Sequence, residues 1–279
     1  MAAQGGGKRA APPSTVHALD GVFKMLRFPY HARPERRARL RPTRFHEQFP
    51  VTAFLLLLNL AFFALEVIQD LKYSRQLGQP ADLIGINSQV LHILGWLRWQ
   101  DLCTGQYWRI VSAAFLHGGV LHIIFNLLML SDLGRHCETF LSSWKFLVAY
   151  GVGILGSAAG SMVVGQLRGV PVASVGASGA ICSLFGLLLV YSLKARQDEL
   201  RDRLIRSVLW IVVITMFIPA NVDHGAHLGG FIAGGIFGLG VRDYMTSREA
   251  LRWRYPALAV SALGLTCLGF AIWNYFSKR

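Results

Sequence analysis

The sequence contains little charge: 15% of its 279 residues are Asp, Glu, Lys or Arg, whereas 53% are hydrophobic. A soluble domain carries about 25% charged residues. The charged residues form short patches between long apolar runs, which argues against a soluble enzyme. Only helices or closed barrels span membranes, and these apolar runs are continuous rather than alternating. The sequence therefore predicts an all-α polytopic membrane protein.

Cysteine is scarce, and its spacing fits neither a disulfide framework nor a metal site. The four residues Cys103, Cys137, Cys182 and Cys267 form no CxxC pair and fall mostly at different predicted depths. The sequence has no HExxH motif, and no acidic residue or cysteine stands at a good third-ligand position beside its membrane histidines. No metal is expected.

A cleavable signal peptide is also missing, because residues 1–49 contain no long apolar region. These residues carry ten of the 28 Lys and Arg residues and predict a basic cytosolic tail. A mitochondrial transit peptide is the alternative, but Ser is scarce and Asp20 and Glu35 interrupt the stretch. The basic residues cluster at helix ends rather than on one face, so we expect no nucleic-acid partner.

Seven apolar runs approach the roughly 20 residues that a membrane-spanning helix needs. They cover residues 50–68, 110–131, 146–164, 174–193, 207–220, 225–241 and 256–276. Of the 28 Lys and Arg residues, 21 fall in the tail and in alternate connections, and seven fall on the other side. The positive-inside rule then places the N-terminus inside and the C-terminus outside. The one long outer connection, 69–109, either lies partly in the leaflet or stands outside the membrane.

Ser178 lies near the outer start of the fourth apolar run, between Gly176 and Gly179. Glycines allow other backbone to approach closely, but small residues in membrane helices usually serve packing. Taken by itself, this GxSG tetrapeptide favours packing over catalysis. Polar groups in a membrane are costly, however, and often functional.

Two histidines mark the start of the sixth apolar run: His224 directly precedes it, and His227 lies deeper, within it. A neutral imidazole that reaches the Ser178 hydroxyl would accept its proton during attack on a carbonyl. Gly230 and Gly234 follow at a four-residue spacing that permits close helix packing. A structural histidine inside the bundle is the alternative, and His224 is a second candidate base.

The second run carries His117, His122 and Asn126, of which His122 and Asn126 share one helix face. An imidazole and an amide at the depth of Ser178 would supply donors for a developing oxyanion. Hydrogen bonds between helices are the alternative role. Trp108 and Arg109 precede this run, as interfacial anchors often do.

Taken together, these motifs resemble the rhomboid family of intramembrane serine proteases. The motifs occur in the family's order: Trp108-Arg109, His117-x4-His122-x3-Asn126, Gly176-Ala177-Ser178-Gly179 and Ala226-His227-x-Gly229-Gly230. Gly134 and Glu138, just after the second apolar run, also match the family pattern. The resemblance covers residues 50–241 and implies a rhomboid-like six-helix catalytic core there. The basic N-terminal tail (1–49) and the loop with a seventh transmembrane helix (242–279) lie outside it.

The resemblance also implies roles for individual residues. Ser178 would be the nucleophile and His227 the general base, with His122, Asn126 and the Ser178 N–H around the oxyanion. His117 would support that site, and Trp108 and Arg109 would lie beside the substrate's path. The family cleaves transmembrane substrates without metal or cofactor.

One residue departs from the family pattern. Many members have an aromatic residue four positions after the nucleophile, where it packs on the histidine, but this chain has Cys182. Orientation of His227 must then come from elsewhere. A catalytically weak or inactive rhomboid-like protein that binds membrane-protein clients is therefore the alternative function. A bacterial inner membrane is the expected location, with mitochondrial or other internal membranes as alternatives; oligomeric state stays open.

Overall fold

The computed structural model describes residues 44–78, 84–169, 172–217, 222–241 and 247–277. Within these ranges the regular elements are helices, joined by two isolated β-bridges. The basic tail before residue 44 lies outside the described residues. The helices are α3 (Phe45–Gln48), α4 (Pro50–Gln76), α5 (Ser88–Leu94), α6 (Trp99–Cys103), α7 (Arg109–Ser112), η1 (Ala113–Phe115), α8 (Val120–Phe140), α9 (Ser143–Arg168), α10 (Ser178–Lys194), α11 (Asp198–Phe217), α12 (His224–Gly240) and α13 (Ser247–Ser277).

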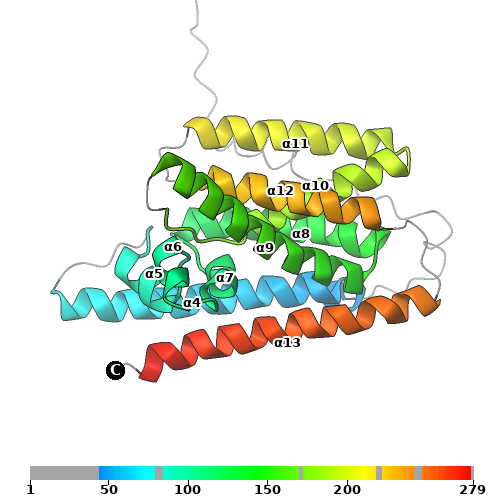
Figure 1. Ribbon diagram of the computed structural model, residues 1–279. Coiled ribbons are helices and arrows are strands. Elements are labelled where there is room, and N and C mark those ends of the chain that lie inside the picture. Colours follow the sequence, from blue (N-terminus) through cyan, green and yellow to red (C-terminus); the bar gives the residue numbers. More distant parts are fainter. Residues whose placement is uncertain (1–43, 79–83, 170–171, 218–221, 242–246, 278–279) are drawn as a thin grey trace, which may run out of the picture.

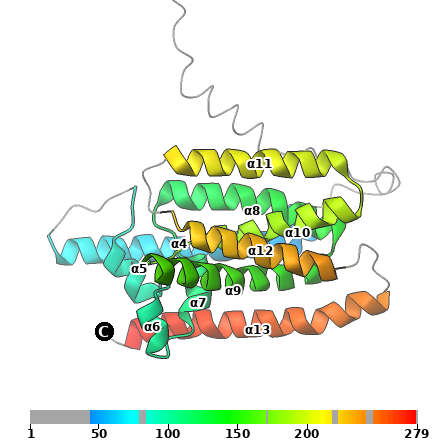
Figure 2. The ribbon, with the colours of Figure 1, turned by 45° about the horizontal axis from the view of Figure 1, so that its top comes forward.

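The long helices lie side by side, with α11 and α13 at opposite edges of the bundle (Figures 1 and 2). Three of them are long and apolar enough to cross a membrane: α4, α9 and residues Arg252–Ser277 of α13. Helix α10 is apolar but shorter. The all-α polytopic membrane fold predicted from the sequence is thereby confirmed.

The expectation of one helix over residues 110–131 is wrong. The chain forms α7 and η1, then an extended stretch, and α8 begins only at Val120. Gly119 lies so close to Ile84 that a methyl group on it would come within 3.0 Å of the Ile84 carbonyl oxygen. That oxygen accepts a hydrogen bond from Val120 N at 2.9 Å. The contact with the preceding connection therefore breaks the helix, although the residues themselves are apolar.

Other helix boundaries differ because a helix does not end where apolar composition ends. Helix α11 begins at Asp198 rather than 207, and α13 begins at Ser247 rather than 256. Helix α9 also extends beyond the predicted 146–164 at both ends. Helix α10, by contrast, begins at Ser178, four residues after the predicted start of its apolar run.

Helix α12 packs between α9 and α10, and glycine makes this packing possible. A methyl group on Gly230 would lie closer than 3.0 Å to the Gly179 carbonyl oxygen of α10, and one on Gly160 of α9 would equally collide with Gly225. A side chain at either position would force the helices apart. The starts of α10 and α12 are thus held against each other.

Glu138, near the end of α8, joins the first turns of two other helices. Its carboxylate accepts hydrogen bonds from Thr52 N and Thr52 Oγ1, both at 2.7 Å, and from Ser143 Oγ at 2.5 Å. Beside it, a methyl group on Gly134 would lie 2.6 Å from Thr52 Oγ1. The two residues tie α8 to the beginnings of α4 and α9.

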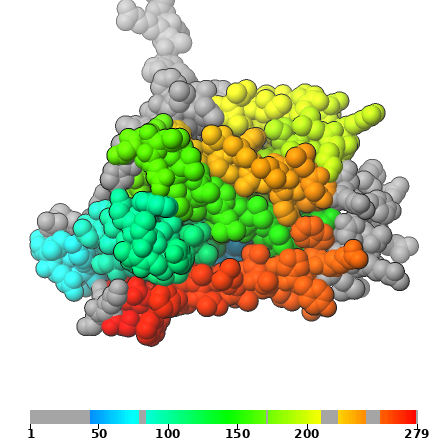
Figure 3. Space-filling model, in the orientation of Figure 1, coloured from blue at the N-terminus to red at the C-terminus, as the bar shows by residue number. Residues whose placement is uncertain are grey.

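Helix α13 runs along one face of the molecule, where it packs against α9, α7 and α5 (Figure 3). Near its end the Tyr275 hydroxyl donates a hydrogen bond to the Gln69 side chain of α4. Phe270 packs against Trp108, with ring centroids 6.0 Å apart. The last helix therefore braces the part of the chain that carries the short helices.

Candidate active site

Ser178 is the first residue of α10, at the end of a loop that is fastened to its surroundings. Gly176 N donates to the Ala113 carbonyl oxygen at 2.8 Å, and Ser174 pairs with Leu97 in a β-bridge. Gly176 has φ +120°, a conformation that residues with a side chain rarely adopt. The first N–H groups of a helix have no acceptor within it, so Ser178 stands among free donors.

His227 lies one turn into α12, and its Nε2 is 2.7 Å from Ser178 Oγ. Asp223 caps this helix by accepting a hydrogen bond from Ala226 N at 2.9 Å. His224, the second candidate base, does not take the position of His227 beside Ser178. Its ring packs edge-on against the His227 ring, with the ring centroids 6.5 Å apart. The structure therefore brings together the serine and the histidine that the sequence singled out first.

His122 of α8 faces the same point. Its Nδ1 accepts a hydrogen bond from Gly118 N at 3.3 Å, so the proton of a neutral ring belongs on Nε2. A methyl group on Gly176 would lie 2.7 Å from His122 Nε2 and 3.6 Å from Ser178 Oγ. The protonated nitrogen of His122 therefore opens onto the space beside the serine.

Asn126 lies one turn further along α8 and is buried. Its Nδ2 donates to the His122 carbonyl oxygen at 2.8 Å, an arrangement that follows from their four-residue spacing. The ring of His117 packs on the His122 ring at a centroid distance of 5.2 Å and is fully buried. These three residues form one continuous polar cluster at the start of α8.

Trp108 and Arg109 do not together form an interfacial anchor, because the Arg109 side chain is buried, with 5% of the residue exposed. The Arg109 guanidinium donates to the carbonyl oxygens of His92 and Trp96, at 2.8 and 3.1 Å, and stacks on the Trp108 ring. The pair therefore holds the fold of the outer connection together. Its contacts lie with α5 and α13 rather than with Ser178.

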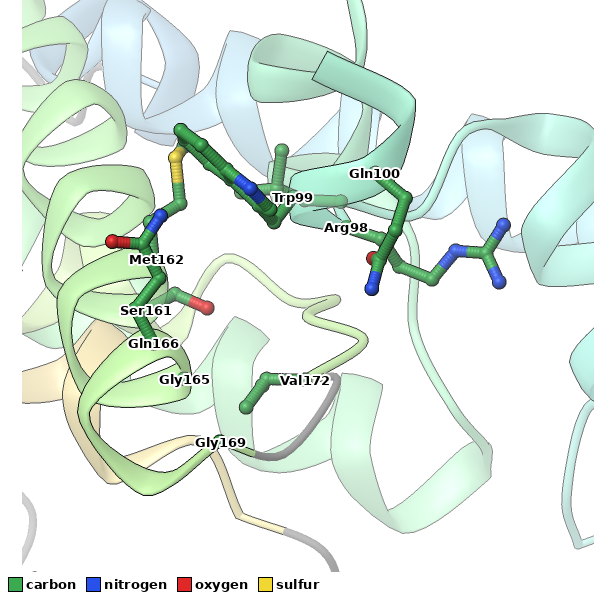
Figure 4. Close-up of a pocket in the computed structure, with 10 residues that line it drawn as sticks. Arg98, Trp99, Gln100, Ser161, Met162, Gly165, Gln166, Gly169 and Val172 are labelled. Carbon is green, nitrogen blue, oxygen red and sulfur yellow. The ribbon is translucent and has the colours of Figure 1, made fainter. Parts of the chain in front are cut away.

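Two cavities lie beside the outer connection, and only the smaller one borders the loop that leads into Ser178. The larger, about 190 Å³, lies between Arg98, Trp99 and Gln100 on one side and the end of α9, including Gln166, on the other (Figure 4). The smaller, about 20 Å³, is lined by Ser157, Ser174 and Gly176 among others, and both include Leu97 in their walls. The smaller space suits a single water molecule.

Glu66 of α4 is a site residue that the sequence analysis missed. Its side chain is fully buried, and its Oε2 accepts a hydrogen bond from His117 N at 3.0 Å. The available signal was an acidic residue within an apolar run, since ionisable groups there usually have a function.

The same part of the chain matches a family model. Residues 104–244 match the Rhomboid domain, a segment that contains every site residue named above except Glu66. The chain belongs to the rhomboid family. Its relatives include rhomboid protease GluP of Bacillus subtilis, 34% identical over 152 residues, and rhomboid-type serine protease 2 of Emericella nidulans, 36% identical over 153. Each alignment covers 53% of this chain and 29% of the relative.

The putative rhomboid protease YdcA of Bacillus subtilis is 33% identical over 147 residues, which are 49% of this chain and 72% of YdcA. Against the first two rhomboid relatives, the chain spans less than a third of their length. Cys182 of this rhomboid is half-buried in α10 and is not part of a disulfide. Within the described ranges, the ring that packs against His227 is that of His224.

Proposed function

We propose that this protein is an intramembrane serine endopeptidase that cleaves transmembrane protein substrates. The observation that carries the proposal is the distance of 2.7 Å between His227 Nε2 and Ser178 Oγ. At this distance a neutral imidazole accepts the hydroxyl proton as the oxygen attacks a peptide carbonyl. The same imidazole then returns the proton to the leaving amine, and water hydrolyses the acyl-enzyme.

The oxyanion that forms during attack needs donors on the side of Ser178 away from His227. His122 Nε2, which opens onto Gly176, and the Ser178 N–H at the helix start suit this role. Asn126 adds a side-chain amide on the same helix face as His122. A substrate helix must unwind locally to reach this site, because an intact helix keeps its carbonyls in hydrogen bonds.

We place the protein in a bacterial inner membrane, with seven spans and the N-terminus in the cytoplasm. The distribution of Lys and Arg supports this orientation, which sets the Ser178 end of the bundle on the outer side. A mitochondrial or other internal membrane is the alternative location. In either membrane the cavities beside Ser157 and Gln166 would supply water from that side.

The test is cleavage of a single-span substrate by purified protein in liposomes. We expect cleavage by the wild type and its loss in Ser178→Ala and His227→Ala. The matched control is Ser192→Ala, because Ser192 is a buried serine at the opposite end of α10 whose hydroxyl donates to the Leu189 carbonyl oxygen of the same helix. Equal cleavage by Ser178→Ala would reject the nucleophile.

A second measurement separates the client-binding alternative. A fluorophosphonate probe should label the wild type but not Ser178→Ala, because labelling requires an activated serine. Absence of labelling, together with capture of uncleaved substrate, would favour a protein that binds membrane clients. The reason to consider this alternative is Cys182, which stands where many family members have an aromatic residue.

A further inference from the structure

Glu66 is a carboxyl group that the proposed reaction does not use. It lies in α4, where 0% of the residue is exposed, and its Oε1 has no hydrogen-bond partner in the described part of the chain. A carboxyl group inside an apolar helix is costly, and one with an unsatisfied oxygen is more so. Its Oε2 makes a single hydrogen bond, from His117 N at 3.0 Å. This bond joins α4 to the turn that precedes α8.

That turn contains two successive amides with different acceptors. His117 N donates to Glu66, and Gly118 N donates to His122 Nδ1 at 3.3 Å. The second bond fixes both the tautomer and the orientation of His122, because an amide only donates. The first bond holds the peptide group immediately before the one that makes the second, and the two share only the Cα of His117. Glu66 and the His122 ring are therefore connected through one residue of backbone.

The His117 side chain adds to this connection. Its Nδ1 donates to the Phe115 carbonyl oxygen at 3.2 Å, and its ring packs edge-on against His122 at 5.2 Å. Phe63, on the same helix as Glu66, packs edge-on against the His117 ring, with the ring centroids 6.4 Å apart. Helix α4 thus holds both the backbone and the side chain of His117.

We propose that Glu66 is a positioning residue that holds the His117–Gly118 turn and thereby directs His122 Nε2 toward Ser178. The inference rests on the proposed function, in which His122 donates to the oxyanion. Glu66 acts through the turn and does not touch the substrate.

Asp70 provides a matched control one turn further along α4. It is also buried, and its Oδ1 accepts a backbone hydrogen bond, from Asn87 N at 2.8 Å, but that amide begins α5 in the outer connection. Glu66→Met and Asp70→Leu each remove one buried acceptor from the same helix. Glu66→Gln keeps an oxygen that can accept from His117 N.

We expect kcat of Glu66→Met to fall about 10- to 100-fold with little change in KM, the size of effect that misplacement by about 1 Å has on a reacting group. Glu66→Gln should stay within about threefold of the wild type, and Asp70→Leu should lose thermal stability while keeping kcat. Equal losses of kcat in Glu66→Met and Asp70→Leu, or in Glu66→Met and Glu66→Gln, would overturn the proposal.

A readout without cleavage separates this inference from the proposed function. Nitrogen-15 NMR of labelled histidine, with His122 assigned by its absence in His122→Gln, reports which ring nitrogen is protonated. We expect a protonated Nε2 in the wild type and Glu66→Gln, and a mixture of tautomers in Glu66→Met. An unchanged His122 signal in Glu66→Met overturns the positioning role. If the wild type cleaves nothing, the protease proposal fails while the NMR result still decides the role of Glu66.

Discussion

In the loop that leads into Ser178, Gly176 is the residue that tolerates a side chain least. A methyl group there would lie 2.7 Å from His122 Nε2, and the backbone has φ +120°. We expect Gly176→Ala to displace His122 and lower kcat about 100-fold, as misplacement of a catalytic group does. The strained backbone should also cost about 1–3 kcal/mol of stability. Cleavage kinetics and thermal unfolding measure the two effects.

The control for this variant is Gly169→Ala at the end of α9. Gly169 also has a positive φ, +62°, but a methyl group there would meet nothing within 4 Å. It should lower stability by backbone strain and leave kcat unchanged. If both variants lose kcat equally, strain rather than the collision with His122 is responsible.

Single residues differ in how well the sequence predicts their surroundings. Ser178 and His227 stood out because a hydroxyl and an imidazole in apolar runs are unusual, and a family motif surrounds each. Glu66 was equally unusual but lies outside the matched segment 104–244, and its partner is a backbone amide that no side-chain motif encodes. The buried position of Arg109 was missed because two of its acceptors are backbone carbonyl oxygens, those of His92 and Trp96.

At the scale of elements, α13 should stabilise the outer connection through the contact between Phe270 and Trp108. Such an aromatic pair contributes about 0.5–1.5 kcal/mol. We expect Phe270→Ala to speed hydrogen exchange in residues 88–112. Leu265→Ala, a comparably exposed residue of α13, should not. Equal exchange in both variants would mean that α13 does not brace this region.

The side chains of His92, Arg98, Asp101 and Arg109, which lie around α6, should make the stability of the outer connection sensitive to acid. Burial lowers the pKa of His92, and the charges of Arg109 and Arg98 lower it further. Burial alone would raise the pKa of Asp101, but the hydrogen bond from Arg98 and the charge of Arg109 outweigh it, so that pKa is lowered too. Arg98 Nη2 donates to His92 Nε2 at 2.9 Å, which requires a neutral imidazole.

Both pKa values are lower in the folded state, so the unfolded state binds more protons and acid favours unfolding. The contribution of His92 is complete above its unfolded pKa of 6.5 and is lost as pH falls below it. That of Asp101 is lost only below 3.8. The Tm of the wild type should therefore fall between about pH 7.5 and about pH 5.5. His92→Gln should show a smaller fall, and an equal fall would exclude His92 as the cause.

Element boundaries were predicted less well than element type, for two physical reasons. Hydropathy marks where a chain prefers lipid, but the hydrogen-bond ladder of α11 continues back to Asp198 through charged residues. In the opposite direction, residues 110–131 are apolar enough for a span, yet the contact of Gly119 with Ile84 breaks the helix. That contact joins residues 35 positions apart, which local composition does not encode.

For the whole molecule, the sequence predicted the helical bundle, and the glycine spacing of α12 indicated a close neighbour without naming it. That the neighbour includes α10 was implied only by the resemblance to the rhomboid family. The sequence did not predict on which face α13 packs. The exposed residues of a membrane helix are as apolar as its packed ones, so no amphipathic pattern marks the contact. Phe270, which packs on Trp108, is itself 43% exposed.

Orientation in the membrane is the property of the whole molecule that the native cysteines can test. Cys103 is exposed at the end of α6, in the outer connection, whereas Cys137 is buried and Cys182 and Cys267 are partly buried. If the excess of 21 over seven basic residues lies inside, Cys103 faces the outside. A membrane-impermeant maleimide should then label intact spheroplasts.

The label should disappear in Cys103→Ser. Adding Glu199→Cys to that variant places a thiol on an exposed position in the first turn of α11, on the side expected to be inside. It should react only after the membrane is permeabilised. The reverse pattern would set the Ser178 end of the bundle in the cytoplasm and contradict the positive-inside assignment. Because Ser178 and α6 belong to the same end, the result also fixes the side from which water must reach the proposed dyad.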